Sequence, residues 1–291
     1  MKFAFIVEKV AVFSVRAMCR VLRVSASGYY AWRARPKSDR ELDNEVLAIE
    51  IEVVHEQSRG TYGSPRITRE LRERGHTVSK RRVANQMRKQ GIRGKKRRRF
   101  RKTTDSNHGL TVPPNLLARV FERKSPNEAW VTDVTAVWTG AGWVYLAVLL
   151  DLFSRTVVGW ATSLHNDTAL ALTALDEAVA NRRPPPGLIH HSDRGSPYAS
   201  VEYRDRLKHY GMVASMSRTG DCWDNAVAES FFATLKGEEL DHHWFPSHVA
   251  ARAVIDDYIN NFYNPVRRHS TLGYISPDEF ELRAQLTVMA A

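Results

Sequence analysis

Cysteine is scarce in this chain, and long apolar runs are missing. Cys19 and Cys222 are the two cysteines among 291 residues, and they lie far apart in the sequence. Such a pair predicts neither a disulfide framework nor a cysteine-based zinc site, and it is typical of a reducing compartment. No segment approaches the ~18 to 20 consecutive apolar residues of a membrane span, and residues 1–12 are not followed by a signal-peptide cleavage site. We therefore expect a cytoplasmic protein with no membrane partner.

Acidic residues are few in the first part of the chain, and basic residues are few in the second. Residues 1–124 hold 30 Lys or Arg against 12 Asp or Glu, whereas residues 125–291 hold 13 against 20. The two parts carry formal charges of +18 and −7, which sum to the +11 of the whole chain. Basic regions neutralise phosphates, and clustered carboxylates can bind metal ions. This division is typical of metal-dependent enzymes that act on nucleic acid.

The spacing of apolar residues predicts two all-α helix-turn-helix modules at the start of the chain. The first covers residues 1–40, with two short helices inside residues 14–34, a break at residues 25–28 and a linker at residues 36–40. The second covers residues 41–102 and opens with a helix over residues 42–57.

Two further helices are expected in the second module. Ser64 and Pro65 begin one that Gly75 ends, and Ser79 caps another that runs over residues 80–90. A short helix, a turn containing glycine and a second helix are what a major-groove reader requires.

The last of these helices has a polar, cationic outer face. We expect DNA contacts from Lys80, Arg81, Arg82, Asn85, Arg88 and Lys89. Such a face can also be merely solvated. DNA is favoured because eight of the ten residues over 93–102 are Lys or Arg, and this run repels itself unless phosphates screen it. Within it we expect contacts from Lys95, Lys96, Arg97, Arg98 and Arg99.

A polar linker over residues 103–124 precedes a change of pattern. Residues 125–240 contain strand-like and helix-like segments in a definite order, and residues 241–291 read as a helical extension. Strands are predicted over 129–138, 142–150 and 155–161, then a helix over 168–181, a strand over 188–191, a helix over 198–210, a strand over 212–217 and a helix over 223–239. A three-stranded meander followed by alternating helices and strands is the order of an α/β, ribonuclease-H-like fold.

Three carboxylates occupy conspicuous places in this order. Asp133 lies in the middle of the first strand, Asp193 directly follows the fourth, and Glu229 lies on the helix expected to cross the sheet. A buried, unpaired carboxylate costs on the order of several kcal/mol, so oxygen ligands from three elements favour a Mg²⁺ site. The spacing alone is weak support, and the placement carries the hypothesis. Asp151, at the end of the second strand, is expected to fix the hairpin through backbone hydrogen bonds.

Taken together, these residues resemble a known family. The triad, with 35 residues between its last two members, resembles the DDE signature of retroviral integrases and bacterial insertion-sequence transposases. The segment YNPVRRHSTLGYISP over residues 263–277 closely resembles the end of the large-frame (OrfB-type) transposase of the third insertion-sequence family. Residues 18–22 and 27–32 match as well, so the resemblance covers nearly the whole chain.

The resemblance implies a catalytic and metal-binding role for Asp133, Asp193 and Glu229, with two Mg²⁺ ions for which Mn²⁺ can substitute. It also implies that Lys236, two helical turns after Glu229 and on the same face, contacts DNA. The expected partners are the element's terminal repeats and target DNA, a small-frame helix-turn-helix and zipper subunit, and further copies of the chain in the active complex. A nucleoid-associated location follows. Cys19, His55 and His76 do not have the spacing of the zinc module of retroviral integrases, so no zinc is expected.

The expected reaction is DNA strand transfer. Two metal ions roughly 3.5–4 Å apart stabilise the attacking and leaving oxygens of an in-line displacement. Water would nick the element's end, and the freed 3′-hydroxyl would attack target DNA. A tyrosine-type recombinase is an alternative, since Tyr263, Arg267 and His269 are residue types it uses, although their order is wrong for it. A non-enzymatic helix-turn-helix regulator is another, but it leaves Asp133 without a purpose.

Overall fold

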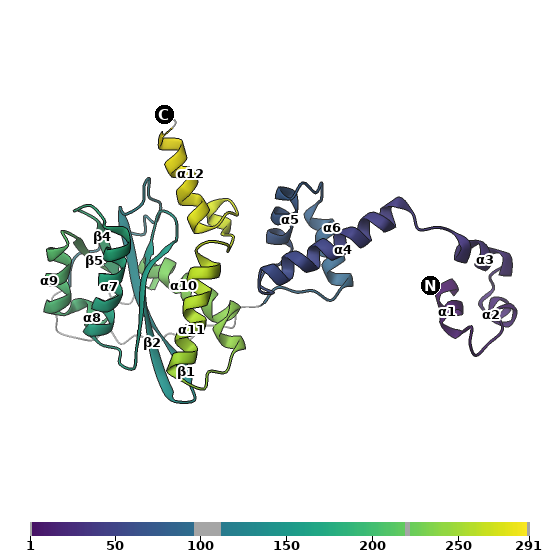
Figure 1. Ribbon diagram of the computed structural model, residues 1–291, viewed down its shortest axis with the longest axis horizontal. Helices are drawn as coiled ribbons and strands as arrows, with labels where there is room; N and C mark the ends of the chain where they lie inside the picture. Colours follow the sequence, from purple (N-terminus) through teal and green to yellow (C-terminus); the bar gives the residue numbers. More distant parts are fainter. Residues whose placement is uncertain (1, 96–111, 219–221, 290–291) are drawn as a thin grey trace.

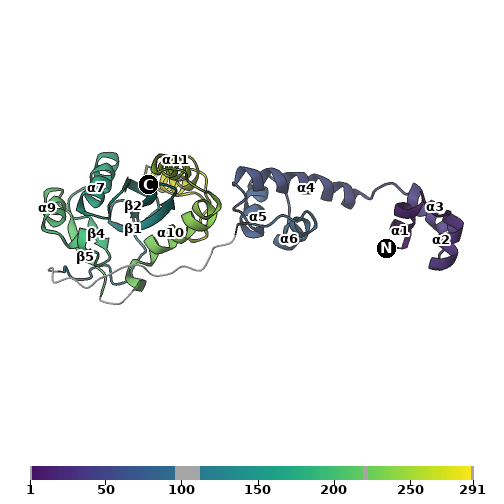
Figure 2. The ribbon, with the colours of Figure 1, turned by 90° about the horizontal axis from the view of Figure 1, so that it is seen from below.

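A computed structural model describes residues 2–95, 112–218 and 222–289. The chain begins with two groups of helices, followed by a sheet covered by helices on both faces (Figure 1). The first group consists of α1 (Lys2–Lys9), α2 (Val15–Leu22) and α3 (Ala26–Ala34). Its small core contains Ile6, Met18, Cys19 and Tyr29. Figures 1 and 2 both show this group at the end of α4 that is remote from the sheet.

Serine caps set the helix starts in this region. Ser25 caps α3, so the break lies at residues 23–25, and residues 26–28 of the expected break belong to the helix. Ser38 forms a capping box with Glu41, which starts α4 (Asp39–Gln57) three residues earlier than expected and absorbs part of the expected linker. The helix α1 was not predicted, because Lys2, Glu8 and Lys9 interrupt its apolar pattern.

The second group of helices packs around one shared core and also touches the rest of the chain. It consists of α4, α5 (Ser64–Glu73) and α6 (Lys80–Lys89), the last capped by Ser79 as expected. Arg268, from the C-terminal tail, donates from Nε to Glu70 at 2.7 Å and pairs with Glu73. Tyr62 accepts a 2.7 Å hydrogen bond from the Arg268 backbone. These contacts dock α5 and the segment before it against the C-terminal tail.

A five-stranded mixed sheet forms the centre of the larger part. Its order is β3-β2-β1-β4-β5, with β1, β2 and β3 antiparallel and β4 and β5 parallel to β1. The strands are β1 (Ala129–Thr139), β2 (Gly142–Asp151), β3 (Val157–Ser163), β4 (Ile189–Ser192) and β5 (Val213–Met216). The expected meander and the ribonuclease-H-like order are confirmed, and the alternation of side chains along β1 and β2 builds an apolar core on each face.

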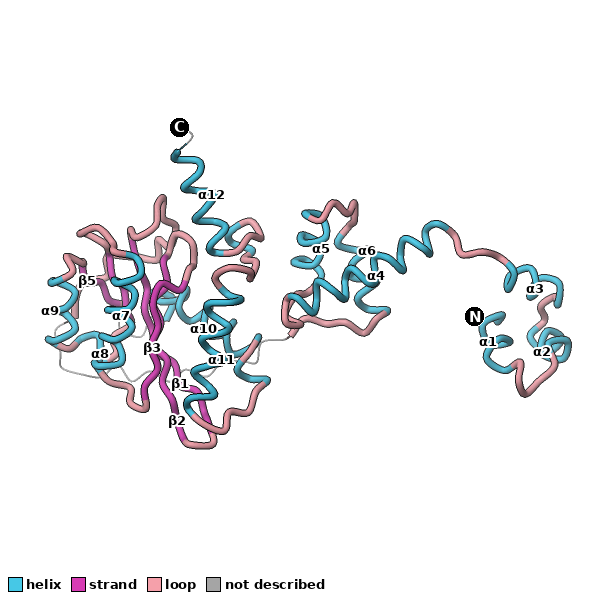
Figure 3. The backbone as a smooth tube through the Cα atoms, viewed as in Figure 1, coloured by secondary structure: helices cyan, strands magenta, loops and turns pink. Residues whose placement is uncertain are grey.

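Helices cover both faces of this sheet (Figure 3). One face is packed by α7 (Thr168–Arg182), α8 (Ser196–Ala199) and α9 (Val201–His209). The other is packed by α10 (Ala226–Glu238) and α11 (His248–Tyr258). The remaining elements are short helical turns at Cys222–Asn225, Leu240–His242, Ile259–Tyr263 and Ser270–Leu272, and α12 (Pro277–Met289). Within the described ranges, no helix has the length and apolar character needed to cross a membrane.

Two predicted helices differ in detail. The single helix expected over residues 198–210 is divided, because Ser200 adopts an extended backbone and caps α9 instead of continuing α8. The helix expected from residue 223 begins at Ala226, after a 3₁₀ turn over Cys222–Asn225.

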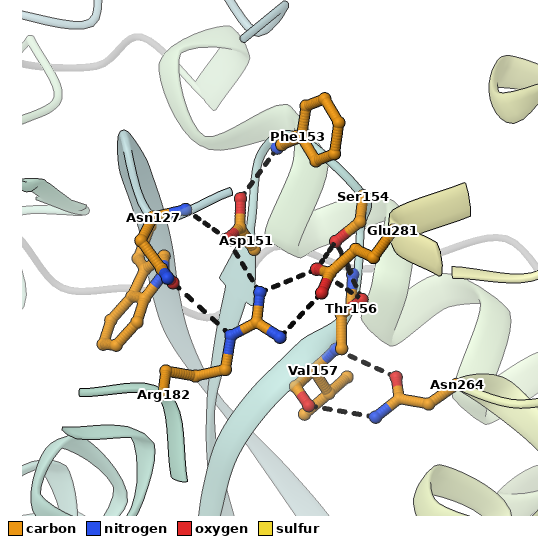
Figure 4. A network of polar contacts seen from close by, with 10 residues as sticks. Asn127, Asp151, Phe153, Ser154, Thr156, Val157, Arg182, Asn264 and Glu281 are labelled. Atoms are coloured by element: carbon orange, nitrogen blue, oxygen red, sulfur yellow. Dashed lines mark hydrogen bonds and ion pairs between the residues drawn. The ribbon is translucent and has the colours of Figure 1, made fainter. Parts of the chain in front are cut away.

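Asp151 takes the role expected of it in the β2–β3 hairpin. Figure 4 shows its carboxylate accepting hydrogen bonds from the backbone N–H groups of Asn127 at 2.8 Å and Phe153 at 2.9 Å. Arg182 Nη2 lies 3.5 Å from Asp151 Oδ2. The same guanidinium group donates to both carboxylate oxygens of Glu281, which also accepts from the Ser154 hydroxyl. The network ties the hairpin to α7 and α12, so Asp151 has a structural role.

Candidate active site

Asp133 lies on β1, and Asp193 directly follows the neighbouring parallel strand β4. Val131 of β1 pairs with His191 of β4, and each aspartate follows two residues later along the same direction. Asp133 is still within β1, opposite Val148 of β2, whereas Asp193 is the first residue after β4. The parallel register therefore brings both carboxylates to one edge of the sheet, where open α/β sheets hold their ligands.

Local hydrogen bonds orient these two side chains. Asp133 Oδ1 accepts from the Val134 backbone at 2.8 Å, and Asp193 Oδ1 accepts from the Gly195 backbone at 2.9 Å. A Cβ at Gly195 would lie 2.9 Å from that same oxygen, so the turn after β4 leaves room for no side chain there. Both aspartates are half-buried.

The third carboxylate comes from α10, which is anchored directly to β1. Glu229 is half-buried in the first turn of the helix. Just before that helix, Asn225 Nδ2 donates to the Thr132 carbonyl at 3.1 Å, one residue from Asp133. The hydrogen bond fixes the start of α10 relative to the strand that carries Asp133.

Asp224 lies in the turn directly before α10 and fixes this turn through a second set of hydrogen bonds. Its buried carboxylate accepts from Arg218 at 2.9 and 3.0 Å, from Arg119 at 3.0 Å and from Asn115 at 2.8 Å. The hydrogen bonds of Arg218 hold the pKa of Asp224 well below its usual value. Asp224 and Asn225 were not predicted to have these roles, although an Asp-Asn pair before a helix is a recognisable start signal.

The three carboxylates of the site lie close enough together for their negative charges to affect one another. The pKa of Asp133 is raised well above its usual value, first by burial, then by the charge of Asp193, with a further contribution from Glu229. The charge of Lys236 opposes this shift. Burial lowers the pKa of Lys236, against the influence of Asp241 and Asp133. Asp133 thus lies close enough to Asp193, Glu229 and Lys236 for their charges to shift its pKa.

Hard oxygen donors that repel one another are a suitable setting for a divalent cation. In the part of the chain that the structure describes, no three His, Cys, Asp or Glu side chains are arranged to hold a metal ion by themselves. Mg²⁺ commonly uses one or two carboxylates and completes its shell with water and substrate phosphates. The donor chemistry of Asp133, Asp193 and Glu229 fits that ion.

The expected DNA-contacting residues fall into three groups. The exposed residues of α6 are Lys80, Arg81, Asn85, Arg88 and Lys89. Two others turn towards the protein: Arg82 Nε donates to Asn44 at 3.0 Å, and Lys95 Nζ donates to the Glu238 carbonyl at 2.7 Å. Lys96, Arg97, Arg98 and Arg99 lie outside the described residues.

The residues that suggested a tyrosine recombinase are used for packing and ion pairing. Tyr263 is only 3% exposed and meets Phe231 and His269 edge to face. Arg267 donates to both carboxylate oxygens of Glu238 at 2.6 Å. Burial lowers the pKa of His269 well below its usual value, and the charge of Arg267 adds to the effect. Nothing in this arrangement supports a phosphotyrosine mechanism.

Known domain families match most of the chain. The chain matches an integrase core domain over residues 123–222 and again over residues 210–277, and an HTH-like domain over residues 41–100. Solved structures with related folds include the HTLV-2 integrase catalytic core domain in complex with magnesium, with 18% identity, a TM-score of 0.44 and coverage of 54% of this chain and 97% of that one.

Full-length relatives are much more similar. An uncharacterised 31 kDa protein of insertion element IS600 from Shigella sonnei is 46% identical over 263 residues, which are 90% of this chain and 97% of that protein. The InsF transposase of insertion sequence IS3A from Escherichia coli K12 is 42% identical over 288 residues, which are 97% of this chain and 98% of that protein. With its integrase core and its HTH-like domain, the chain belongs to the InsF family of insertion-sequence transposases.

Proposed function

We propose that this chain cuts and rejoins DNA strands at the ends of an insertion element, using divalent metal ions held by Asp133, Asp193 and Glu229. The observation that carries this proposal is the convergence of three half-buried carboxylates, two brought to one edge of the sheet by the parallel register of β1 and β4 and one supplied by α10, which is anchored to β1. Burial and the charges of Asp193 and Glu229 raise the pKa of Asp133, in agreement with this arrangement. A fold accepts such repulsion where a cation can neutralise it, and perturbed carboxylates concentrate at functional sites.

The proposed chemistry consists of two phosphoryl transfers. In the first, water attacks the phosphorus at the element's end, the bond to the 3′-oxygen breaks, and a 3′-hydroxyl is released. In the second, that hydroxyl attacks a target phosphorus and displaces the target's own 3′-oxygen. Bound Mg²⁺ or Mn²⁺, expected as a pair, would supply stabilisation of charge on the attacking and leaving oxygens. The chain contributes the three carboxylates that hold the cations and the rigid strand and helix that orient them.

Other parts of the chain would place the DNA. The exposed cations of α6 would contact DNA along its groove, and Lys236, on the same face of α10 as Glu229, would contact the DNA end. Arg82 and Lys95 would have to leave their partners within the protein to take part. We further propose that the active complex contains several copies of the chain and a small-frame subunit that completes recognition of the terminal repeats.

The test is strand joining by the full chain on duplexes carrying the ends of its own element, with Mg²⁺ or Mn²⁺. Asp133→Asn, Asp193→Asn and Glu229→Gln should each abolish cleavage and joining while leaving DNA affinity unchanged. Glu202→Gln, on the exposed surface of α9, is the matched control and should be fully active. Calorimetry of Mn²⁺ binding gives a second readout, and the triad variants should bind the ion more weakly. Full activity in any one triad variant removes that residue from the proposed site.

A further inference from the structure

A cavity of about 230 Å³ lies between α10 and the C-terminal tail, and the proposed reaction does not use it. Its wall is built from four separate segments: α5, the β2–β3 turn, α10 and the tail. The polar residues most important to it are Arg66, Arg155, Ser230, Arg267, His269 and Ser270. No Asp or Glu is among its lining residues, all of which the structure describes. Three guanidinium groups without a carboxylate in the wall favour an anionic ligand.

This cavity is separate from the proposed catalytic site although both use α10. The helix residues that line it are 226, 227, 230, 231 and 234, which share one helical face. Glu229 and Lys236 share another face, roughly 140° around the helix at about 100° per residue. A ligand in the cavity would therefore contact a different face of α10 from the one that carries Glu229.

The positive charge of the cavity is only partly balanced within the protein. Arg267 is fully engaged by Glu238. Arg66 donates from Nε to the Arg268 carbonyl at 2.9 Å, and its Nη1 lies 3.7 Å from the same Glu238. Among the described residues, this single carboxylate is the ion-pair partner of both arginines, and Arg155 forms no ion pair. The three guanidinium groups and this one carboxylate therefore carry a net charge of +2.

Arg155 is the least satisfied of the three. Its Nη2 makes one long hydrogen bond, 3.4 Å, to the Phe121 carbonyl, and its Nη1 is buried with no hydrogen-bond partner. Its backbone is in the left-handed region, with φ of 65°, a conformation that favours glycine or asparagine. An arginine with a strained backbone and a buried donor that has no partner indicates a ligand that accepts from it.

We propose that this cavity binds a phosphate group of the DNA backbone, held by Arg155 and Arg66 with the hydroxyl groups of Ser230 and Ser270 at its exposed rim. The choice of DNA rests on the proposed function, and free phosphate shares the same chemistry. Because Arg66 belongs to α5 and Arg155 to the β2–β3 turn, the site is complete only when the second group of helices is docked. DNA bound there would hold that docked arrangement in place beside the catalytic helix.

The experiment measures how DNA affinity depends on salt. The full chain binds a labelled 20-base-pair duplex in EDTA, without catalysis, and fluorescence anisotropy is followed from 50 to 300 mM KCl. The slope of log K against log[salt] is negative, and each lost phosphate contact lowers its magnitude by about 1. Arg155→Gln and Ser270→Asp should each lower it by that amount, and Arg155→Lys should restore most of it. Arg183→Gln is the matched control, since Arg183 also has a left-handed backbone but lies on the exposed end of α7.

Other outcomes separate the alternatives. If Arg155→Gln and Arg183→Gln share the wild-type slope, the proposal is wrong. If inorganic phosphate binds the wild type but not Arg155→Gln while the DNA slope is unchanged, the cavity takes a free anion only, and the DNA proposal is overturned. A circular-dichroism melting curve shows whether each variant is folded, and Ser270→Asp, at an exposed position, provides the test if Arg155→Gln does not fold. If Arg155→Gln weakens the salt dependence of DNA binding but the wild-type chain joins no DNA, the result supports the cavity and contradicts the proposed function.

Discussion

Replacing Arg267 with methionine should destabilise the protein strongly, because it leaves the Glu238 carboxylate buried without its main partner. Arg267 supplies two hydrogen bonds of 2.6 Å to Glu238, and the side chains of the pair are only 5% and 9% exposed. The Tyr258 hydroxyl donates a third, at 2.8 Å, which would remain. Removing one partner of a buried ion pair costs about 3–5 kcal/mol. Because Arg66 stays 3.7 Å from Glu238, we expect the lower end, about 3 kcal/mol.

The pH dependence of this loss identifies its cause. Burial raises the pKa of Glu238, but the hydrogen bonds and charge of Arg267 outweigh it and hold the pKa below its usual value. A carboxyl with a lowered pKa contributes stability above its unfolded pKa of about 4.3, and the contribution is lost as pH falls through the folded pKa. Between pH 7 and pH 5 the wild type therefore keeps this contribution. In Arg267→Met burial acts without the guanidinium, so the carboxyl gains a proton in that range and the deficit of the variant should shrink.

Urea unfolding measures both effects. Tryptophan fluorescence reports mainly on the sheet and its helices, because six of the seven tryptophans follow residue 125. The control is Arg283→Met, which breaks an exposed pair with Glu279 on α12 and should cost less than about 1 kcal/mol. A loss below about 1 kcal/mol for Arg267→Met, or a deficit that is the same at pH 7 and pH 5, would refute the reasoning.

Three further predictions concern the start of α10, the packing of β3 against α7 and the end of β2. Asn225→Ala removes the hydrogen bond to the Thr132 carbonyl and should slow single-turnover strand joining by about 10- to 100-fold without changing DNA affinity; an unchanged rate would exclude a positioning role. Gly159→Ala would place a Cβ 2.6 Å from the Ala178 side chain, so a melting curve should reveal a loss of about 1–3 kcal/mol unless α7 can move away. Asp151→Asn should lower the melting temperature but leave the joining rate per folded molecule unchanged, and a catalytic defect would show that Asp151 acts in the reaction.

The regular elements of the fold could be predicted because their signals are local. Alternation along β1 and β2, serine caps and the sequence Ser64-Pro65 each depend on residues only a few positions apart. The placement of Asp133 and Asp193 followed from the same local signals, since parallel neighbouring strands end at one edge of a sheet. Where two local signals compete, as at Ser200, the sequence did not reveal that a cap would outweigh helix continuation.

The contacts that join the parts of the chain could not be predicted in this way. Arg268 reaches Glu70 across 198 positions of sequence, and Arg267 reaches Glu238 across 29. Nothing in one sequence says which arginine meets which glutamate over such separations. For the same reason Arg82 and Lys95 were predicted to contact DNA, although the structure gives each of them a partner in the protein. Charge composition indicates an electrostatic surface, but the three-dimensional fold decides which charges remain available.

Two aspartates near the start of α10, the buried Asp224 and the half-buried Asp133, show why geometry is needed to single out the carboxylates that we propose as catalytic. Asp224 is surrounded by guanidinium groups, and its pKa is lowered. Asp133, which is joined to the same corner through Asn225 and Thr132, has burial and two carboxylates as the causes of a raised pKa. The fold therefore neutralises one aspartate internally and leaves the other with an excess of negative charge. Only the second kind of site gains from a cation, so the neighbours of each carboxylate, and not the net charge of the region, distinguish structural positions from those that we propose as catalytic.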